Sequence, residues 1–313
     1  MAPTGIVKSL VDSSPQVVPP SLPGELLTLD QRAGPLAVYR AGEALPGPPA
    51  LLVHSLNAAA SAYEIRPVFL HLGATRPVYA LDLPGFGCSS RAQRPYTPRL
   101  LTDAVLDVSS EIRRRHPSLP IDLLGLSLGS ELVARAALEA PEQFRSLALV
   151  SPTGFNGKKR FYGPAGSTRE VALARWLLHE RAYAPALFRA LTRPGVVRYF
   201  LERTFGKKEI DEGLWAHAVA TAQAEGAHLA PLAFLSASLF SADINGVYEA
   251  LTLPVWMSHG VRGDFVDYRG QTTVAQRPNW TITTFSTGAM PYFEEPEAFF
   301  AAADAFWAKV PGR

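Results

Sequence analysis

The sequence predicts an α/β protein whose central sheet is mostly parallel and covered by helices on both faces. Short apolar runs alternate with helical patterns between residues 49 and 154, and this order is typical of parallel sheets. The alternation stops near residue 155 and resumes near residue 254, which indicates an insertion. One apolar run also leads directly into a Gly-x-Ser-x-Gly turn and a helix-forming segment, as found at the carboxyl edge of such sheets.

Composition places the chain among ordinary globular proteins. It has 313 residues, 47% of them hydrophobic and 19% charged, with a formal net charge of +2, so overall charge favours no class of partner. Cys88 is the single cysteine, which excludes an internal disulfide and leads us to expect a cytoplasmic protein. There is neither a signal-peptide pattern nor an apolar run of transmembrane length, so we expect no secretion and no membrane span.

The first half of the chain supplies most of the predicted sheet. Residues 1–24 contain two proline clusters and are predicted to form an arm or linker. Strand patterns at 26–29 and 36–40 flank a Gly-Pro turn and predict an antiparallel hairpin. The further strands are predicted at 49–55, 77–81, 121–124 and 147–150, with helices at 60–72, 100–115 and 131–140.

A helical insertion is predicted to interrupt the sheet. Residues 156–245 show helical stretches rich in large side chains but no convincing strand, and we interpret them as a cap or lid. Residues 25–155 and 246–313 would then form the core. Within the second core segment, strands are predicted at 254–258 and 280–285 and a final amphipathic helix at 295–310.

The insertion is strongly basic. Between residues 157 and 210 there are twelve Lys and Arg against four Glu, a local balance of +8. Such a surface over a binding site could attract an anionic ligand. A solvated helical face without a specific partner is the alternative interpretation.

Ser127 is the candidate nucleophile. It lies in Gly125-Leu126-Ser127-Leu128-Gly129, between an apolar run and a helical pattern, which is the setting of a nucleophile elbow. Glycine on both sides tolerates the close backbone approach of such a strained turn. The alternative is a serine that only caps the following helix.

A catalytic serine needs other groups around it. It requires a base, normally a histidine oriented by a carboxylate, and two backbone N–H donors for the oxyanion. In elbow enzymes one donor is the residue after the serine, here Leu128, and the other comes from the loop after an earlier strand. For that second donor the candidate is Leu56.

These motifs together resemble those of the α/β-hydrolase fold family, in its cap-containing serine esterase-like form. The matches are the oxyanion loop at 54–56, the D-x-P-G-x-G loop at 82–87, the elbow, the acid loop at 260–264 and the terminal loop at 287–291 followed by Glu295-Pro296. They follow the family's order of nucleophile, acid and base over residues 50 to 300. The resemblance implies Ser127 as nucleophile, Asp264 as acid and Leu56 and Leu128 as oxyanion donors.

Two positions depart from the family pattern. Ser55 replaces the usual glycine of the oxyanion loop and adds a hydroxyl there. More seriously, the family's catalytic histidine falls on Ala289. Asp264 would then have no imidazole to orient. Asp267 is the second candidate for the acid. The alternative for Asp264 is a structural aspartate that accepts backbone N–H groups of a turn.

No other histidine is expected to replace the missing base. His54 belongs to the oxyanion loop, and the cap histidines would sit on a lid that supports a base poorly. His259 comes closest by position, at the end of the strand before the acid loop, but its backbone would have to reach across that loop. The seven histidines are His54, His71, His116, His179, His217, His228 and His259.

Ala289 has two competing explanations. Either a native histidine has been changed deliberately to stop turnover, or the natural protein has lost its base and acts as a binding protein on a hydrolase fold. The intact elbow, oxyanion loop and acid loop favour the first explanation. In both cases the chain should be nearly inactive, because loss of a triad base lowers turnover by about 10⁴ to 10⁶.

Ester hydrolysis through an acyl-enzyme is the predicted chemistry. By resemblance, the dehalogenase and epoxide-hydrolase branches use an aspartate at the elbow, so Ser127 argues against them. Carbon–carbon bond hydrolysis, acyl transfer and perhydrolysis use the same residues and remain alternatives. The apolar cap suggests a small ester with an apolar acyl or aryl group, and the basic excess of the cap suggests an anionic one. The sequence has no cluster of metal-ligating residues and no glycine-rich phosphate-binding loop, so we expect no metal and no cofactor. Its basic residues do not form the stripe of a known nucleic-acid-binding fold, so we expect no nucleic acid.

Overall fold

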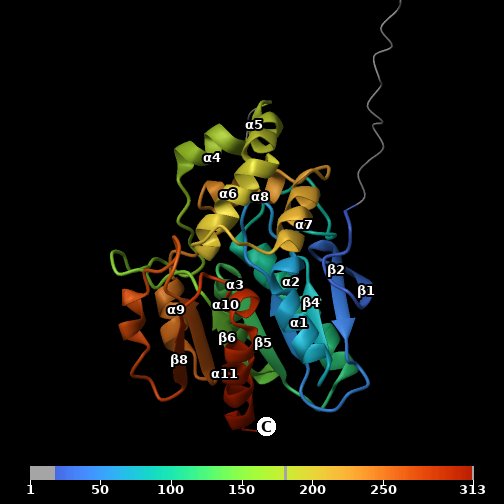
Figure 1. Ribbon diagram of the computed structural model, residues 1–313, viewed down its shortest axis with the longest axis vertical. Coiled ribbons are helices and arrows are strands. Elements are labelled where there is room, and N and C mark those ends of the chain that lie inside the picture. The colour runs from blue at the N-terminus through green and yellow to red at the C-terminus, as the bar shows by residue number, and fades with distance from the viewer. Residues whose placement is uncertain (1–17, 180–181, 312–313) are drawn as a thin grey trace, which may run out of the picture.

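An eight-stranded sheet forms the centre of the protein, with helices on both of its sides (Figure 1). The computed structural model describes residues 18–179 and 182–311. The strand order is β1-β2-β4-β3-β5-β6-β7-β8. The pairs β1–β2 and β2–β4 are antiparallel and the remaining pairs are parallel. The prediction of a mostly parallel sheet between helices is therefore confirmed.

The strands lie close to the predicted positions. β1 and β2 form the expected hairpin, in which Gln31 pairs with Gly34 across the turn. The strands β3 to β7 are buried along their whole length, which explains why their sequences read as continuous apolar runs. Their bounds are β1 Glu25–Gln31, β2 Gly34–Ala41, β3 Ala50–Val53, β4 Val78–Leu81, β5 Ile121–Leu126, β6 Phe144–Val150, β7 Val255–Gly260 and β8 Trp280–Phe285.

One predicted helix is divided in the structure, and another begins one residue later than predicted. The segment predicted at 60–72 forms a short 3₁₀ turn, Ala62–Ile65, followed by α1, Arg66–Gly73, with a proline in the first turn of α1. The helix predicted at 295–310 is α11, Pro296–Lys309, and a separate one-turn helix, α10, Pro291–Glu294, precedes it. Glu295 has non-helical backbone angles, as a following proline favours.

Three further helices pack on the core. α2, Pro98–Arg115, begins where the Thr97 hydroxyl accepts the N–H of Leu100, and its last turn carries basic residues that complement the helix dipole. α3, Gly129–Glu139, follows the elbow, and α9, Ile244–Ala250, precedes β7.

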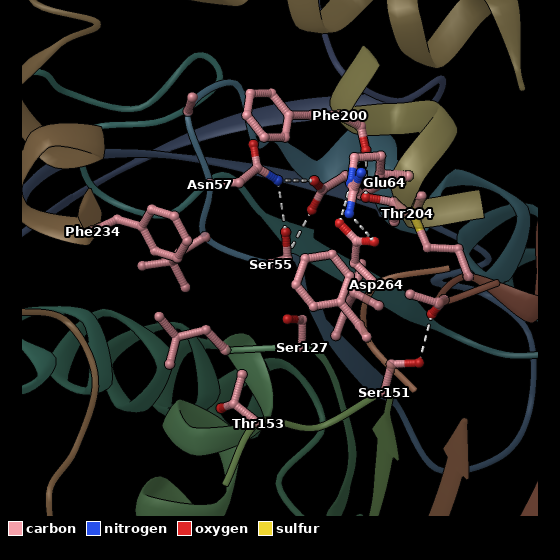
Figure 2. A pocket seen from close by; sticks show the side chains of 18 of the residues that line it. Ser55, Asn57, Glu64, Ser127, Ser151, Thr153, Phe200, Thr204, Phe234 and Asp264 are labelled. Carbon is pink, nitrogen blue, oxygen red and sulfur yellow. Dashed lines mark hydrogen bonds and ion pairs between the residues drawn. The ribbon is translucent and has the colours of Figure 1, made fainter. Parts of the chain in front are cut away.

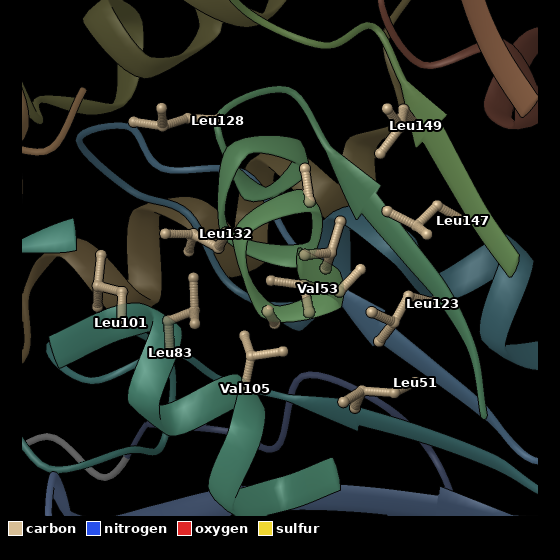
Figure 3. Close-up of a cluster of buried hydrophobic side chains, with 14 of the residues drawn as sticks. Leu51, Val53, Leu83, Leu101, Val105, Leu123, Leu128, Leu132, Leu147 and Leu149 are labelled. Carbon is tan, nitrogen blue, oxygen red and sulfur yellow. The ribbon is translucent and has the colours of Figure 1, made fainter. Parts of the chain in front are cut away.

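The sheet separates two apolar layers. Successive residues of one strand point to opposite faces, so Leu123 contributes to one cluster and Leu124 to the other. Figure 3 shows the first cluster, where Leu123, Leu51 and Leu147 from the sheet lie opposite Val105 of α2. Because both faces of the sheet are buried, the strands are held firmly relative to one another. The candidate site lies at the carboxyl ends of these strands.

Between β6 and α9, the described residues form the five helices α4 to α8, which lie above one end of the sheet (Figure 1). Among the described residues of this stretch, the one β-type pairing is an isolated bridge between Thr168 and Ser241. The division into a core and a cap at residues 156–245 remains a prediction, and we call this stretch the cap. Its helices are α4 Ala172–His179, α5 Ala184–Leu191, α6 Pro194–Phe205, α7 Glu212–Ala222 and α8 Leu229–Leu235.

Part of the predicted N-terminal arm packs on the core. Residues 1–17 lie outside the described residues, but Ser21 is fully buried. Its N–H donates to the Tyr39 hydroxyl, and its Oγ donates to Asp82 at 3.1 Å. Within residues 18–179 and 182–311, every helix is too short or too polar to cross a membrane.

Candidate active site

Ser127 stands in a strained turn at the carboxyl end of β5. Its φ is 52°, in the left-handed region that non-glycine residues rarely adopt, and its N–H donates to the Val150 carbonyl at 2.8 Å. A Cβ on Gly129 would lie 2.3 Å from the His54 carbonyl oxygen, and one on Gly125 would lie 2.7 Å from a methyl of Val133. Both flanking glycines are thus required by close packing, and the turn has the geometry expected of a nucleophile elbow.

A cavity of about 500 Å³ opens beside Ser127. The five predicted site residues, Leu56, Ser127, Leu128, Asp264 and Ala289, all line it. Figure 2 shows the Ser127 hydroxyl among side chains from the sheet edge and from the cap. The cap supplies much of the apolar wall, including Leu191, Val197, Phe200, Leu201, Leu214, Ala218, Phe234, Leu235 and Phe240.

The backbone N–H groups of Leu56 and Leu128 are available to a ligand. Within the described part of the chain, neither of them donates a hydrogen bond to another residue. Leu128 immediately precedes α3, so its N–H belongs to the positive end of that helix. This arrangement suits the predicted role of the two residues as donors to a carbonyl oxygen.

Position 289 places an apolar methyl in the cavity wall. Ala289 is 8% exposed. Its N–H donates to the Thr204 carbonyl at 3.0 Å, and its own carbonyl accepts the Ser151 hydroxyl at 2.7 Å. The terminal loop is therefore held between the cap and the end of β6, with no ionisable side chain at position 289, where the resemblance places a histidine.

No histidine among the described side chains lines the cavity. Both ring nitrogens of His54 are occupied, Nδ1 by the Ser55 carbonyl at 2.5 Å and Nε2 by the Leu83 N–H at 3.0 Å. His259 contacts the Gly260 carbonyl and Gln271, and His217 contacts Ser21. Because none of these three rings lines the cavity, none of them supplies a base at Ser127.

Asp264 is bound by an arginine of the cap. Nη2 of Arg203 donates to Oδ1 of Asp264 at 2.6 Å, and Nε of Arg203 donates to Oδ2. The Asp264 N–H also donates to the Arg203 carbonyl at 3.1 Å, and Nη1 of Arg203 contacts the Tyr199 hydroxyl at 3.1 Å. The carboxylate that would orient a histidine is thus paired with α6.

The second candidate acid, Asp267, is paired as well. It lines the cavity, accepts two hydrogen bonds from the Arg269 guanidinium and accepts the Gly157 N–H at 3.0 Å. The hydrogen bonds from Arg269 hold the pKa of Asp267 well below its usual range. Both candidate acids therefore lie at the cavity, each with an arginine partner.

The basic cap residues contribute little to the cavity wall. Of the described lysines and arginines between 157 and 210, Arg203 alone lines the cavity, and its charge is paired with Asp264. Among the described residues of the cavity wall, these cap residues therefore supply no unpaired cation that would attract an anionic ligand.

A third carboxylate at the cavity has no counterpart among the residues predicted from the sequence. Glu64 is 6% exposed and lines the cavity, where it accepts the Ser55 N–H at 2.9 Å and the Asn57 side-chain amide at 2.6 Å. Ser61-x-x-Glu64 matches a capping box, which would assign the glutamate to a helix start. Its side chain instead reaches back to the oxyanion loop.

Comparison with known proteins agrees with this fold. The family model described as "alpha/beta hydrolase fold" matches residues 48–195. A Caenorhabditis elegans protein named abhydrolase domain-containing protein abhd-5.2 is 26% identical over 167 residues, covering 50% of this chain and 37% of that protein. The pig (Sus scrofa) protein 1-acylglycerol-3-phosphate O-acyltransferase ABHD5 is 37% identical over 114 residues, covering 34% of this chain and 30% of the relative. The matched segment thus spans about a third of each relative's length.

Solved structures extend the likeness over most of the chain. A probable hydrolytic enzyme from Pseudomonas aeruginosa superposes with a TM-score of 0.68 at 19% sequence identity. The superposition covers 92% of this chain and 95% of that one. Such low identity establishes the shared fold alone. Together with the family model, which matches residues 48–195, and the strand–elbow–helix geometry at Ser127, it shows that the chain has the α/β-hydrolase fold.

Proposed function

We propose that this protein binds an apolar carboxylic ester in the cavity beside Ser127 and turns it over only at a residual rate. The ester carbonyl would face the Ser127 hydroxyl and the N–H groups of Leu56 and Leu128, and the acyl group would fill the apolar space under the cap. A largely apolar cavity with a few convergent polar groups is the usual form of a small-molecule site.

The pairing of Asp264 with Arg203 is the observation that carries this proposal. In a serine hydrolase the acid orients the histidine base and stabilises its charged form. Here both carboxylate oxygens are bound by a guanidinium, and an alanine occupies the position of the base. This supports the second explanation of Ala289, a natural loss of the base, over a deliberate change in an otherwise ready triad.

The chemistry of the site, where it occurs, would be acyl transfer to serine. The Ser127 oxygen would attack the carbonyl carbon, and the two N–H donors would stabilise the oxyanion. The ester C–O bond would then break, and the alcohol would leave with the proton lost by the serine hydroxyl. Without a base to accept its proton, the hydroxyl is a weak nucleophile. We therefore expect turnover about 10⁴ to 10⁶ below that of a complete triad.

Acyl transfer to an acceptor other than water is the second candidate. It is favoured by the pig relative, whose name describes an O-acyltransferase and which is 37% identical over 114 residues. The same serine and oxyanion donors would serve both reactions. The two reactions differ in the molecule that takes the acyl group from Ser127, which is water in hydrolysis and another acceptor in acyl transfer.

Restoring the base tests the proposal. We would compare hydrolysis of nitrophenyl hexanoate by the full chain and by the variants Ala289→His, Arg203→Gln and Ala289→His/Arg203→Gln. The double variant should gain at least about 100-fold, because it has both an imidazole and a free acid, and Ser127→Ala should abolish the gain. Neither single variant should gain comparably.

Two results would contradict the proposal. A large gain from Ala289→His alone would mean that Arg203 does not hold the acid, and would favour a deliberate change at position 289. The second result is that no variant gains hydrolytic activity and the parent chain does not bind a nonhydrolysable ester analogue. This would show that the cavity beside Ser127 is not an ester-binding site.

A further inference from the structure

We infer that the Ser55 hydroxyl is a third hydrogen-bond donor to the ligand's carbonyl oxygen, and that Asn57 and Glu64 hold it in position. The inference rests on the proposed function, because it concerns the ligand bound beside Ser127. It also specifies that ligand as an uncharged carbonyl compound.

The side chain of Asn57 is fixed by three hydrogen bonds. Its Oδ1 accepts the Ala59 N–H at 2.8 Å. Its Nδ2 donates to Oε1 of Glu64 at 2.6 Å and to Oγ of Ser55 at 3.0 Å. Figure 2 shows the amide nitrogen of Asn57 directed toward both partners. An amide nitrogen carries two hydrogens, so Asn57 has both of them committed.

This geometry leaves the Ser55 hydroxyl as an unused donor. Ser55 Oγ accepts from Asn57, so the hydroxyl hydrogen must point elsewhere. No acceptor in the described part of the chain takes it. Ser55 is 7% exposed and lines the cavity together with Ser127 and Leu56. A buried donor without an acceptor is unfavourable, and a ligand carbonyl in the cavity would satisfy it.

The charge of Glu64 restricts the ligand class. Among the described residues, Glu64 forms no ion pair, although it is buried at the cavity wall. The other carboxylates that line the cavity, Asp264 and Asp267, are each paired with an arginine. A ligand carboxylate near Ser55 would therefore lie close to a buried glutamate that pairs with no cation among the described residues. A ketone, ester or amide carbonyl would bring no negative charge there.

Binding of matched ligands tests the inference with the full chain. We would measure dissociation constants for 2-undecanone, undecane and decanoate with the parent protein, Ser55→Ala, Ser55→Thr and Glu64→Gln. Ser55→Ala should weaken 2-undecanone binding about tenfold and leave undecane unchanged, and Ser55→Thr, which keeps the hydroxyl, should restore ketone binding. The parent should prefer the ketone to decanoate, and Glu64→Gln should reduce that preference.

Ser151→Ala is the matched control, because Ser151 is also a buried serine at the cavity wall but donates its hydroxyl to Ala289. It should not discriminate ketone from alkane. Equal losses for both ligands in Ser55→Ala, or no loss for either, would overturn the inference while the proposed function stands. Failure of the parent to bind any of the three ligands would instead contradict the proposed function itself.

Discussion

Arg203 and Asp264 form a two-point ion pair that joins cap helix α6 to the loop after β7. Both side chains are partly exposed, at 47% and 39%, so solvent screens their attraction. The pair should therefore contribute little to the stability of the fold.

Replacing the arginine should accordingly leave the fold intact. We expect Arg203→Gln to lower the melting temperature by at most a few degrees, and the difference from the parent should shrink further in about 1 M salt, where the Debye length is ~3 Å. Thermal unfolding followed by circular dichroism measures this, with Lys208→Gln, which removes another exposed ion pair, as the control. A large, salt-independent loss would mean that the pair is a structural support.

Backbone strain at Ser127 should be visible in stability. Because its φ of 52° suits glycine better than any residue with a Cβ, Ser127→Gly should be more stable than Ser127→Ala by about 1 kcal/mol. Urea unfolding of the two variants gives the difference. Equal stabilities would mean that the turn is not strained in solution.

Gly129 should not accept even one methyl group. The added Cβ would lie 2.3 Å from the His54 carbonyl oxygen, so Gly129→Ala should destabilise the protein by about 3 kcal/mol or more. Gly195→Ala is the matched control, because Gly195 lies in α6 and a methyl added there would project into open space. That variant should be neutral or up to about 1 kcal/mol more stable. Comparable losses in both, measured by urea unfolding, would contradict the packing argument.

His217 should make the protein less stable in mild acid. Burial lowers the pKa of His217 below its ordinary value of 6.5, and its ring contacts Ser21 at 3.1 Å. Above about pH 6.5 both the folded and unfolded forms carry a neutral imidazole. As the pH falls through 6.5, the unfolded chain takes up a proton that the folded protein resists, so stability is lost.

Removing the imidazole should remove that part of the pH dependence. We expect the free energy of unfolding of His217→Gln, measured with urea at about pH 7.5 and about pH 5.5, to fall less between the two pH values than that of the parent protein. The same decrease in both proteins would show that His217 is not responsible.

Several features of the fold are readable from short stretches of sequence. The strands β3 to β7 are buried on both faces, so their apolar runs stand out, and the β1–β2 hairpin is marked by Gly34 and Pro35, which begin β2 directly after the turn. The start of α1 is harder to place, because the helical pattern predicted at 60–72 includes a 3₁₀ turn, Ala62–Ile65, before α1 begins at Arg66. A proline in the first turn of α1 favours a helix start there.

The sequence by itself determined that Ser127 lies in a strand–turn–helix elbow and that Ala289 stands where the resemblance places a histidine, because both features reside in local motifs. Tertiary structure alone decided the pairing of Arg203 with Asp264, since these residues lie 61 positions apart and meet only when the cap packs on the sheet. The hydrogen bonds from Glu64 and Asn57 to the oxyanion loop also depend on the folded loop. A motif records which side chains are present, whereas their partners depend on which segments folding brings within hydrogen-bond distance.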